Sequence, residues 1–225
     1  MKDYQKDFLE AARENEILLF DEDGYTLKSG RISPYFFNAG LFNNGNLLRT
    51  VSKAYASALI DPQNSFDFDV LFGPAYKGIP LAVATCQTLA TSGINASYSF
   101  NRKEVKDHGE GGSIVGAPLK GKKIIIIDDV ITSGKAIREA VDIISKAGGT
   151  LTGILVAVDR QEKREEGINE SAIESLEKDL DSVNIRAIIT LQDIIEFARF
   201  KGSSISEEIR TKLEEYQSRW GVRNL

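Results

Sequence analysis

A carboxylate pair and a hydroxyl-rich turn lie close together near the middle of the chain. Residues 124–127, all isoleucine, lead into Asp128 and Asp129, and a Thr-Ser-Gly turn follows at residues 132–134. Backbone amides and hydroxyls at the start of a helix suit a phosphate monoester, because the amides point into one small concavity. Adjacent carboxylates are unsuited to a phosphate, but they suit the vicinal hydroxyls of a sugar or a hydrated Mg²⁺. The spacing therefore predicts a site with an anion-binding end and a polyol-binding end.

A plainer interpretation is that the two aspartates cap a turn and that Thr-Ser-Gly is ordinary helix-start chemistry. A single Asp-x-x-Thr would favour it, but an isoleucine run followed by Asp-Asp-x-x-Thr-Ser-Gly is more specific. This segment resembles the signature of type I phosphoribosyltransferases, which use 5-phosphoribosyl 1-diphosphate (PRPP). The resemblance implies that Asp128 and Asp129 face the ribose hydroxyls of PRPP. It also implies that the 5-phosphate is bound by Thr132, Ser133, Gly134, Lys135 and Ala136, with Val130 and Ile131 lining the PRPP site.

A glycine-flanked loop, residues 73–78, follows another apolar run. Its spacing resembles that of a nucleotide-binding P-loop, but the Gly-Lys-Ser/Thr ending is missing, which excludes that interpretation. A simple turn between a strand and a helix remains an alternative. In similar phosphoribosyltransferases this loop donates backbone amides to the diphosphate, sometimes from a cis peptide. The resemblance therefore implies that Tyr76 and Lys77 contact PRPP.

Basic residues gather in segment 101–112 of an otherwise acidic chain. The segment holds Arg102, Lys103, Lys106 and the single histidine, His108. A solvated loop is the usual interpretation of such a run. The pattern Arg-Lys-x-x-Lys-x-His-Gly-Glu, however, closely resembles the catalytic loop of orotate phosphoribosyltransferases. The resemblance implies that these four side chains are catalytic and contact the diphosphate of PRPP.

The chemistry explains why a basic loop would be useful. Displacement of diphosphate from the anomeric carbon passes through a cation-like ribosyl centre, while negative charge grows on the departing group. Cationic side chains and a Mg²⁺ that bridges the diphosphate oxygens would neutralise this charge, and one loop residue would protonate it, although the sequence leaves open which one. We expect Mg²⁺ to be held mainly by the substrate, through water to Asp128 and Asp129, which belong to the catalytic set. In the family this loop reaches the neighbouring subunit, so the resemblance implies a homodimer with shared active sites.

The residues that bind the acceptor base are expected in the N-terminal part of the chain and after a later strand. Lys28, which the resemblance also places at PRPP, and the pair Phe36-Phe37 match segments that similar enzymes place around orotate, although the aromatic pair alone would be read as core. Arg160 follows an apolar run, and a guanidinium there suits the carboxylate of orotate. Purines and uracil lack this carboxylate, which separates the prediction from a purine or uracil phosphoribosyltransferase. The expected orotate site comprises Lys28, Phe36, Phe37, Thr132 and Arg160.

Strands and helices alternate along most of the chain, as in an α/β fold with a central parallel sheet flanked by helices. Strands are expected at residues 69–72, 96–100, 123–127, 154–158 and 185–189, and helices at 79–91, 135–147 and 171–181. Ligands of open α/β folds bind at the carboxyl ends of the strands. Such a sheet would bring the polar segments to one edge, and the resemblance implies the type I phosphoribosyltransferase fold.

Both ends of the chain are expected to be additions to this sheet. Helices are expected at residues 2–18 and 47–60, with an antiparallel pair between residues 25 and 37. We assign residues 1–60 to a small N-terminal hood, 61–200 to the α/β core, and 201–225 to a C-terminal helix packed on the same domain. Trp220 is expected to anchor that helix, and the charged stretch 161–184 is expected to be a solvated face.

The composition narrows the remaining classes. A chain of 225 residues suits one domain with a full core. Its net charge of −5 argues against a rival function, a non-catalytic regulator that binds nucleic acid. No apolar run approaches the roughly 20 residues that span a bilayer, the start lacks a signal-peptide pattern, and the single Cys86 reads as structural. We expect a cytoplasmic enzyme without membrane or nucleic-acid partners that forms orotidine 5′-phosphate and diphosphate from orotate and PRPP, a step in making pyrimidine nucleotides.

Overall fold

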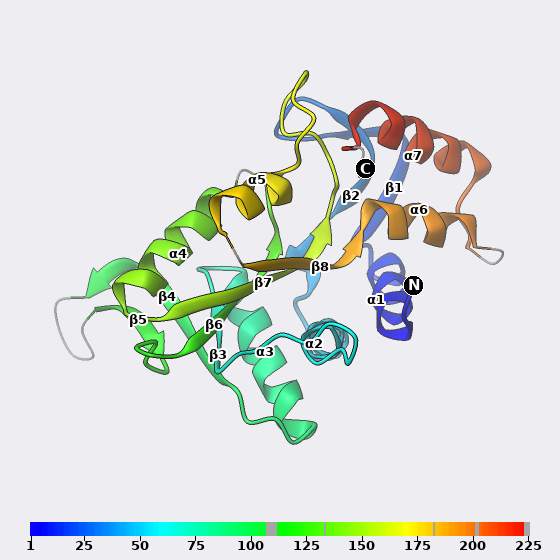
Figure 1. Ribbon diagram of the computed structural model, residues 1–225. Helices are drawn as coiled ribbons and strands as arrows, with labels where there is room; N and C mark the ends of the chain where they lie inside the picture. Colours follow the sequence, from blue (N-terminus) through cyan, green and yellow to red (C-terminus); the bar gives the residue numbers. More distant parts are fainter. Residues whose placement is uncertain (107–111, 133, 182, 201–202, 223–225) are drawn as a thin grey trace.

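The computed structural model describes the chain except for residues 107–111, 133, 182, 201–202 and 223–225 and the side chains of Val105 and Lys106. Its centre is a six-stranded sheet in the order β5-β4-β3-β6-β7-β8 (Figure 1). The strands are β3 (Val70–Gly73), β4 (Ser97–Lys106), β5 (Gly112–Gly116), β6 (Lys123–Val130), β7 (Thr150–Asp159) and β8 (Asn184–Thr190). Neighbours from β4 to β8 are parallel, and β5 pairs antiparallel with β4. The expected central parallel sheet is confirmed.

Helices cover both faces of this sheet, which explains the isoleucine run in β6. Ile124 and Ile126 lie in a core with residues of α4 and α5, whereas Ile125 and Ile127 lie in a second core with residues of α2 and α3. All four have 0% exposure, because successive side chains of a strand point to opposite faces and each face is covered. The covering helices are α2 (Gly45–Leu59), α3 (Gly78–Thr91), α4 (Lys135–Lys146) and α5 (Ala172–Asp179).

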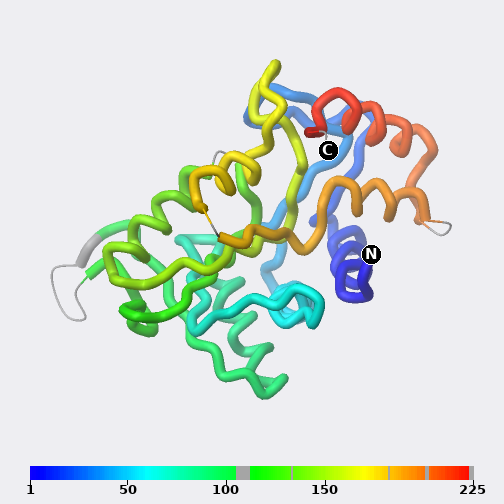
Figure 2. Tube along the Cα trace, in the orientation of Figure 1, coloured from blue at the N-terminus to red at the C-terminus, as the bar shows by residue number. Residues whose placement is uncertain are grey.

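The two ends of the chain meet in a hood beside the sheet. The hood contains an antiparallel pair of strands, as expected, and helices from both termini; Figure 2 shows the red C-terminal helix beside the blue hairpin. Lys212 Nζ donates to Glu22 O at 2.6 Å, which ties the last helix to the first strand. These elements are α1 (Asp3–Glu14), β1 (Leu18–Thr26), β2 (Ile32–Phe37), the short 3-10 helix η1 (Ala39–Leu41), α6 (Leu191–Arg199) and α7 (Glu207–Trp220).

One hydrophobic core joins the three parts of the chain that we distinguished from the sequence. It contains Phe8 from α1, Leu71 from β3 and Tyr216 from α7. The helix α2, from the expected hood, packs on α3 of the expected α/β core, and Thr88 Oγ1 donates to Ser52 Oγ at 2.8 Å. The division into residues 1–60, 61–200 and 201–225 stays a prediction. No helix in the described ranges is long and apolar enough to cross a membrane.

Several element boundaries differ from the expected ones. The first helix ends at Glu14, because Asn15 caps it and Glu16 turns the chain with a φ of 58°. The basic segment is in large part a hairpin, since residues 101–106 continue β4 and Gly112 begins β5. A strand with one partner tolerates such charged residues, which solvent can reach. The helix α6 follows β8 directly and is not among the helices expected from the sequence.

Candidate active site

Asp128 and Asp129 lie at the carboxyl end of β6 with exposures of only 8% and 6%. Asp129 N donates to Asp128 Oδ1 at 2.9 Å, and Lys77 Nζ lies 2.8 Å from Asp129 Oδ2. Burial, together with the negative charge of Asp129, raises the pKa of Asp128 to about 7. The pair therefore combines one carboxylate that has a counterion with a second group that holds a proton near neutral pH.

A hollow of about 340 Å³ extends from Asp128 along the start of α4. Gly134 is the N-cap of α4 and has a φ of 72°, which favours glycine. Gly134 has no side chain and therefore makes no side-chain cap to the first turn of α4. A Cβ at Gly134 would also lie 2.6 Å from the guanidinium of Arg138. The hollow is lined by the expected residues Asp128, Val130, Ile131, Thr132, Gly134, Lys135 and Ala136, whereas Ser133 lies outside the described residues.

The loop between β3 and α3 reaches the same edge because its two glycines allow close packing. A Cβ on Gly73 would lie 2.3 Å from the carbonyl oxygen of Gly78. A Cβ on Gly78 would lie 2.6 Å from the carbonyl oxygen of Ile127, at the end of β6. Larger residues would push this loop away from β6. The close approach brings Lys77 to Asp129.

Tyr76 and the basic segment meet beside this loop. The Ala75–Tyr76 peptide bond is cis. The Tyr76 side chain is 68% exposed. Asn101 Oδ1, on β4, accepts a hydrogen bond from Ala75 N at 3.0 Å. Lys103 Nζ lies 4.6 Å from the centroid of the Tyr76 ring, within the range of a cation–π contact. The strand β4 thus holds the loop and places Lys103 next to it.

The other basic residues are only partly described. Arg102 Nη1 donates to Gly112 O at 3.4 Å across the β4–β5 hairpin. Lys106 ends β4, but its side chain lies outside the description, and so does all of His108. The roles expected of these residues stay predictions.

Phe36 and Phe37, both expected at orotate, have different surroundings. Neighbours in a strand point to opposite faces, and the Phe37 ring lies 6.1 Å from that of Phe8 and packs against the core. The Phe36 ring lies 5.7 Å from that of Tyr25 and is 36% exposed. Lys28 is exposed in the turn between β1 and β2 and makes no hydrogen bond or ion pair with the residues described. Phe36 is therefore the ring of the pair that a ligand can reach.

Arg160 follows β7, and its guanidinium already has partners. Nε and Nη2 lie 2.8 and 2.7 Å from Glu162 Oε1, and Nη2 also donates to Ser33 Oγ at 3.2 Å. The guanidinium carbon lies 4.4 Å from the centroid of the Tyr35 ring. Burial lowers the pKa of Arg160, but Tyr35 and Glu162 outweigh burial and raise it overall. Arg160 therefore keeps its charge in a nearly buried position.

Sequence reasoning missed side chains that hold the site from behind. Tyr55, on α2 with 0% exposure, donates its hydroxyl to Asp128 O at 2.6 Å. Its only signal is a tyrosine on an apolar helix face, where the hydroxyl needs a partner. Glu162 belongs to the stretch that we expected to be a solvated face, yet its side chain is only 10% exposed. That expectation is wrong at Glu162 because two arginines surround its carboxylate.

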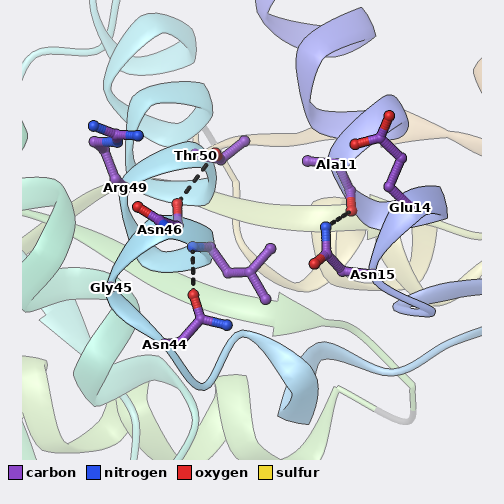
Figure 3. Close-up of a pocket in the computed structure, with 9 residues that line it drawn as sticks. Ala11, Glu14, Asn15, Asn44, Gly45, Asn46, Arg49 and Thr50 are labelled. Atoms are coloured by element: carbon purple, nitrogen blue, oxygen red, sulfur yellow. Dashed lines mark hydrogen bonds between the residues drawn. The ribbon is translucent and has the colours of Figure 1, made fainter.

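A larger hollow of about 640 Å³ lies between the end of α1 and the start of α2 (Figure 3). Its polar groups bond to nearby backbone: Asn15 Nδ2 donates to Ala11 O, and Asn44 Oδ1 accepts from Leu47 N. None of the expected site residues lines it. The smaller hollow at Asp128 is the better candidate, because a carboxyl group and the N-terminus of a helix meet there.

Comparison with known proteins shows the family of the chain. The phosphoribosyl transferase domain model matches residues 41–186. An orotate phosphoribosyltransferase of Marinobacter nauticus is 50% identical over 222 residues, which cover 99% of this chain and 100% of that protein. One of Kluyveromyces lactis is 51% identical over 228 residues, which cover 99% of this chain and 97% of that protein. The chain belongs to the orotate phosphoribosyltransferase family.

A solved structure of this family supports the fold as well. The crystal structure of the orotate phosphoribosyltransferase of Francisella tularensis matches with a TM-score of 0.82 at 38% identity, over 95% of this chain and 98% of that one. The expected type I phosphoribosyltransferase fold is confirmed. The expected enzyme class is confirmed too, against the alternatives of a purine or uracil enzyme and of a non-catalytic regulator.

Proposed function

We propose that the edge formed by the ends of β3, β6 and β7 is the active site at which this chain carries out the orotate phosphoribosyltransferase reaction. PRPP and orotate give orotidine 5′-phosphate and diphosphate, a step in pyrimidine nucleotide synthesis. One observation carries the proposal: the buried pair Asp128 and Asp129 adjoins a hollow walled by the N-terminus of α4. A ribose 5-phosphate needs adjacent surfaces of these two kinds, one for hydroxyls and one for an anion.

The donor is held at both of its ends. The amides and hydroxyls of residues 132–136 bind the 5-phosphate, and the carboxyl groups of Asp128 and Asp129 bind the ribose hydroxyls. Because Asp128 has a pKa of about 7, its carboxyl can donate a hydrogen bond to a sugar oxygen as well as accept one. The Tyr55 hydroxyl fixes the backbone at Asp128 during this exchange.

Diphosphate departs on the side of the loop 73–78. Lys77 lies at Asp129 and Lys103 lies at the Tyr76 ring on that side. We assign to them, with the loop amides, Arg102, Lys106 and His108, the neutralisation of the leaving group.

The described side chains fit a Mg²⁺ that the substrate brings. Within the described residues there is no group of three or more His, Cys, Asp or Glu that could hold a metal. Lys77 also occupies one oxygen of Asp129. Mg²⁺ commonly keeps several waters and is bound by one or two carboxylates and substrate phosphates, which suits Asp128 and Asp129. When bound, the ion would neutralise charge on the diphosphate.

Orotate enters from the side of the hood. Arg160 pairs with its carboxylate, Phe36 covers the ring, and Lys28, Thr132 and the backbone at Phe37 complete the contacts. The position of Arg160 after β7, next to the end of β6, supports this assignment. A guanidinium matches a planar carboxylate in shape as well as in charge.

The protein works as a homodimer with shared active sites in this proposal. The resemblance of segment 101–112 to the family's catalytic loop supports it, and the exposed Tyr76 and Lys103 leave this side of the chain open to a second copy. The cytoplasmic location and the lack of nucleic-acid and membrane partners stay predictions.

The release of diphosphate from PRPP tests the acceptor assignment. The protein is mixed with Mg²⁺ and PRPP, and orotate, hypoxanthine, adenine or uracil is added in turn. We expect turnover with orotate and at most a trace with the other bases. Turnover with a purine and none with orotate would contradict the proposed function.

A further inference from the structure

The guanidinium of Arg160 is fixed along the edge formed by Nε and Nη2. Glu162 Oε1 accepts from both Nε and Nη2, and Ser33 Oγ accepts from Nη2. Within the part of the chain that the structure describes, Nη1 makes no hydrogen bond. The Tyr35 ring lies against the guanidinium. A carboxylate that approaches Nη1 therefore meets a cation that is already aligned.

Glu162 is held from its other side by Arg31. Arg31 Nη1 lies 3.7 Å from Glu162 Oε2, and both side chains are 10% exposed. The guanidinium of Arg31 lies 4.4 Å from the centroid of the Trp220 ring, at the end of α7. A bridge between Glu162 and Gly221 ties this loop to the residue after α7. Tyr35 donates its hydroxyl to Glu162 Oε1 at 3.4 Å.

The charges of this cluster do not balance. Two guanidiniums, Arg31 and Arg160, share the single carboxylate of Glu162, which leaves a net charge of +1. The described residues provide no second acidic partner for either arginine. Burial raises the pKa of Tyr35 and of Tyr216, so neither hydroxyl supplies the missing negative charge. A nearly buried, unbalanced charge is costly, and one bound anion would balance it.

We propose that Glu162 is a positioning residue for the acceptor: it aligns Arg160 while Arg31 offsets its charge, so that the cluster of Arg31, Glu162 and Arg160 takes up one carboxylate. This inference rests on the proposed function, in which that carboxylate belongs to orotate. It also gives the end of α7 a role, because Trp220 and Gly221 hold Arg31 and Glu162 in place.

The test compares KM and kcat for both substrates in Glu162 variants. Glu162→Ala should raise the KM for orotate at least about 10-fold, because a charge-assisted contact to Arg160 is lost. The KM for PRPP should stay within about twofold of the wild-type value. An equal rise in the KM of both substrates would instead indicate general damage to the fold. Glu162→Gln keeps an acceptor oxygen and should stay within about threefold of the wild type. Glu170→Ala is the matched control, because Glu170 pairs with Arg164 and Lys178 in the same connecting segment.

Arg160→Ala separates this inference from the proposed function. If that variant leaves the KM for orotate unchanged, the acceptor site itself is wrong. If it raises this KM while Glu162→Ala does not, the positioning role alone is overturned. In the double variant, Glu162→Ala should raise the KM for orotate less than about twofold above that of Arg160→Ala alone. Fully additive changes in the free energy of orotate binding would overturn the positioning role too.

A second variant keeps the test decisive if Glu162→Ala does not fold. Glu162→Asp shortens the side chain by one methylene, so its carboxylate cannot keep both contacts to Arg160. We expect it to raise the KM for orotate about fivefold or more. A wild-type KM for orotate in Glu162→Asp would contradict the positioning role.

Discussion

The ammonium group of Lys77 lies 2.8 Å from Asp129 Oδ2, so an ion pair joins the loop after β3 to the end of β6. Asp128 has no such partner at ion-pair distance among the residues described, and burial keeps its carboxyl protonated up to about pH 7. The adjacent carboxyl groups therefore differ in their surroundings: Asp129 is paired with Lys77, whereas burial raises the pKa of Asp128. This difference suits a site that must hold sugar hydroxyls on one side and face a departing anion on the other.

The raised pKa of Asp128 predicts a pH dependence of stability. Between the ordinary pKa of 3.8 and about 7 the folded protein binds a proton that the unfolded chain has lost. The free energy of unfolding should therefore fall as pH rises through this window and then level off. Asp128→Asn cannot ionise, so its stability relative to the wild type should increase from pH 4 to pH 7 in urea unfolding. A difference that stays constant with pH would contradict the assignment.

Lys103→Ala should lower kcat far more than it weakens PRPP binding. The residue stands beside Tyr76 in the loop 73–78, where in the proposed function charge grows only as the leaving group departs. Removal of one such donor commonly lowers kcat by about 10²–10³-fold. Steady-state kinetics and calorimetric binding of PRPP measure the two effects, and Lys122→Ala, an exposed lysine in the turn before β6, is the control. Equal losses in both would show that Lys103 serves ground-state binding.

Shared active sites predict complementation between inactive variants. In mixed dimers of Lys103→Ala and Asp129→Asn chains, one site of each heterodimer receives an intact Lys103 from its partner and keeps its own Asp129. Random pairing makes half of the dimers mixed, so about a quarter of the wild-type activity should return. No recovery after verified subunit exchange would mean that each chain uses its own Lys103.

Tyr55→Phe tests the support behind the carboxylate pair. The variant leaves the buried carbonyl of Asp128 without its partner, which should lower the free energy of unfolding by about 1–2 kcal/mol. Tyr98→Phe is the control, because the Tyr98 side chain is 39% exposed and solvent can replace a lost hydrogen bond there. We expect that control to stay within about 0.5 kcal/mol of the wild type. Equal effects of the two variants in urea unfolding would contradict the role of Tyr55.

The sequence predicted the parts of the site that depend on local order. An isoleucine strand followed by Asp128, Asp129 and a Thr-Ser-Gly turn had to place carboxyl groups and helix amides at one edge, because chain direction fixes which end of a parallel strand they occupy. The glycine-flanked loop 73–78 was also predicted, because it follows the end of another parallel strand, β3. Trp220 was expected to anchor packing, and its ring indeed stacks on Arg31.

Contacts between distant segments could not be read in this way. Tyr55 and Asp128 are 73 positions apart, and no local pattern signals their hydrogen bond. Glu162 resembled a solvated residue until the hood placed Arg31 over it. Phe36 and Phe37 were expected together at orotate, but the alternation of side chains along β2 separates their rings. The strands at residues 101–106 and 112–116 were not predicted either. Pairing between β4 and β5, rather than the propensity of single residues, decides their conformation.

Calorimetric binding of PRPP in the presence of Mg²⁺ tests the central claim most directly. A second pair of aspartates serves as the matched control. Asp67 and Asp69 contact Lys123, the first residue of β6, whereas Asp128 and Asp129 lie at the other end of that strand. Asp128→Asn with Asp129→Asn should weaken binding at least about 100-fold, since the hydrogen bonds between the ribose hydroxyls and both carboxyl groups are lost. Asp67→Asn with Asp69→Asn should bind PRPP like the wild type. Unchanged affinity in the first double variant would contradict a donor site at the end of β6.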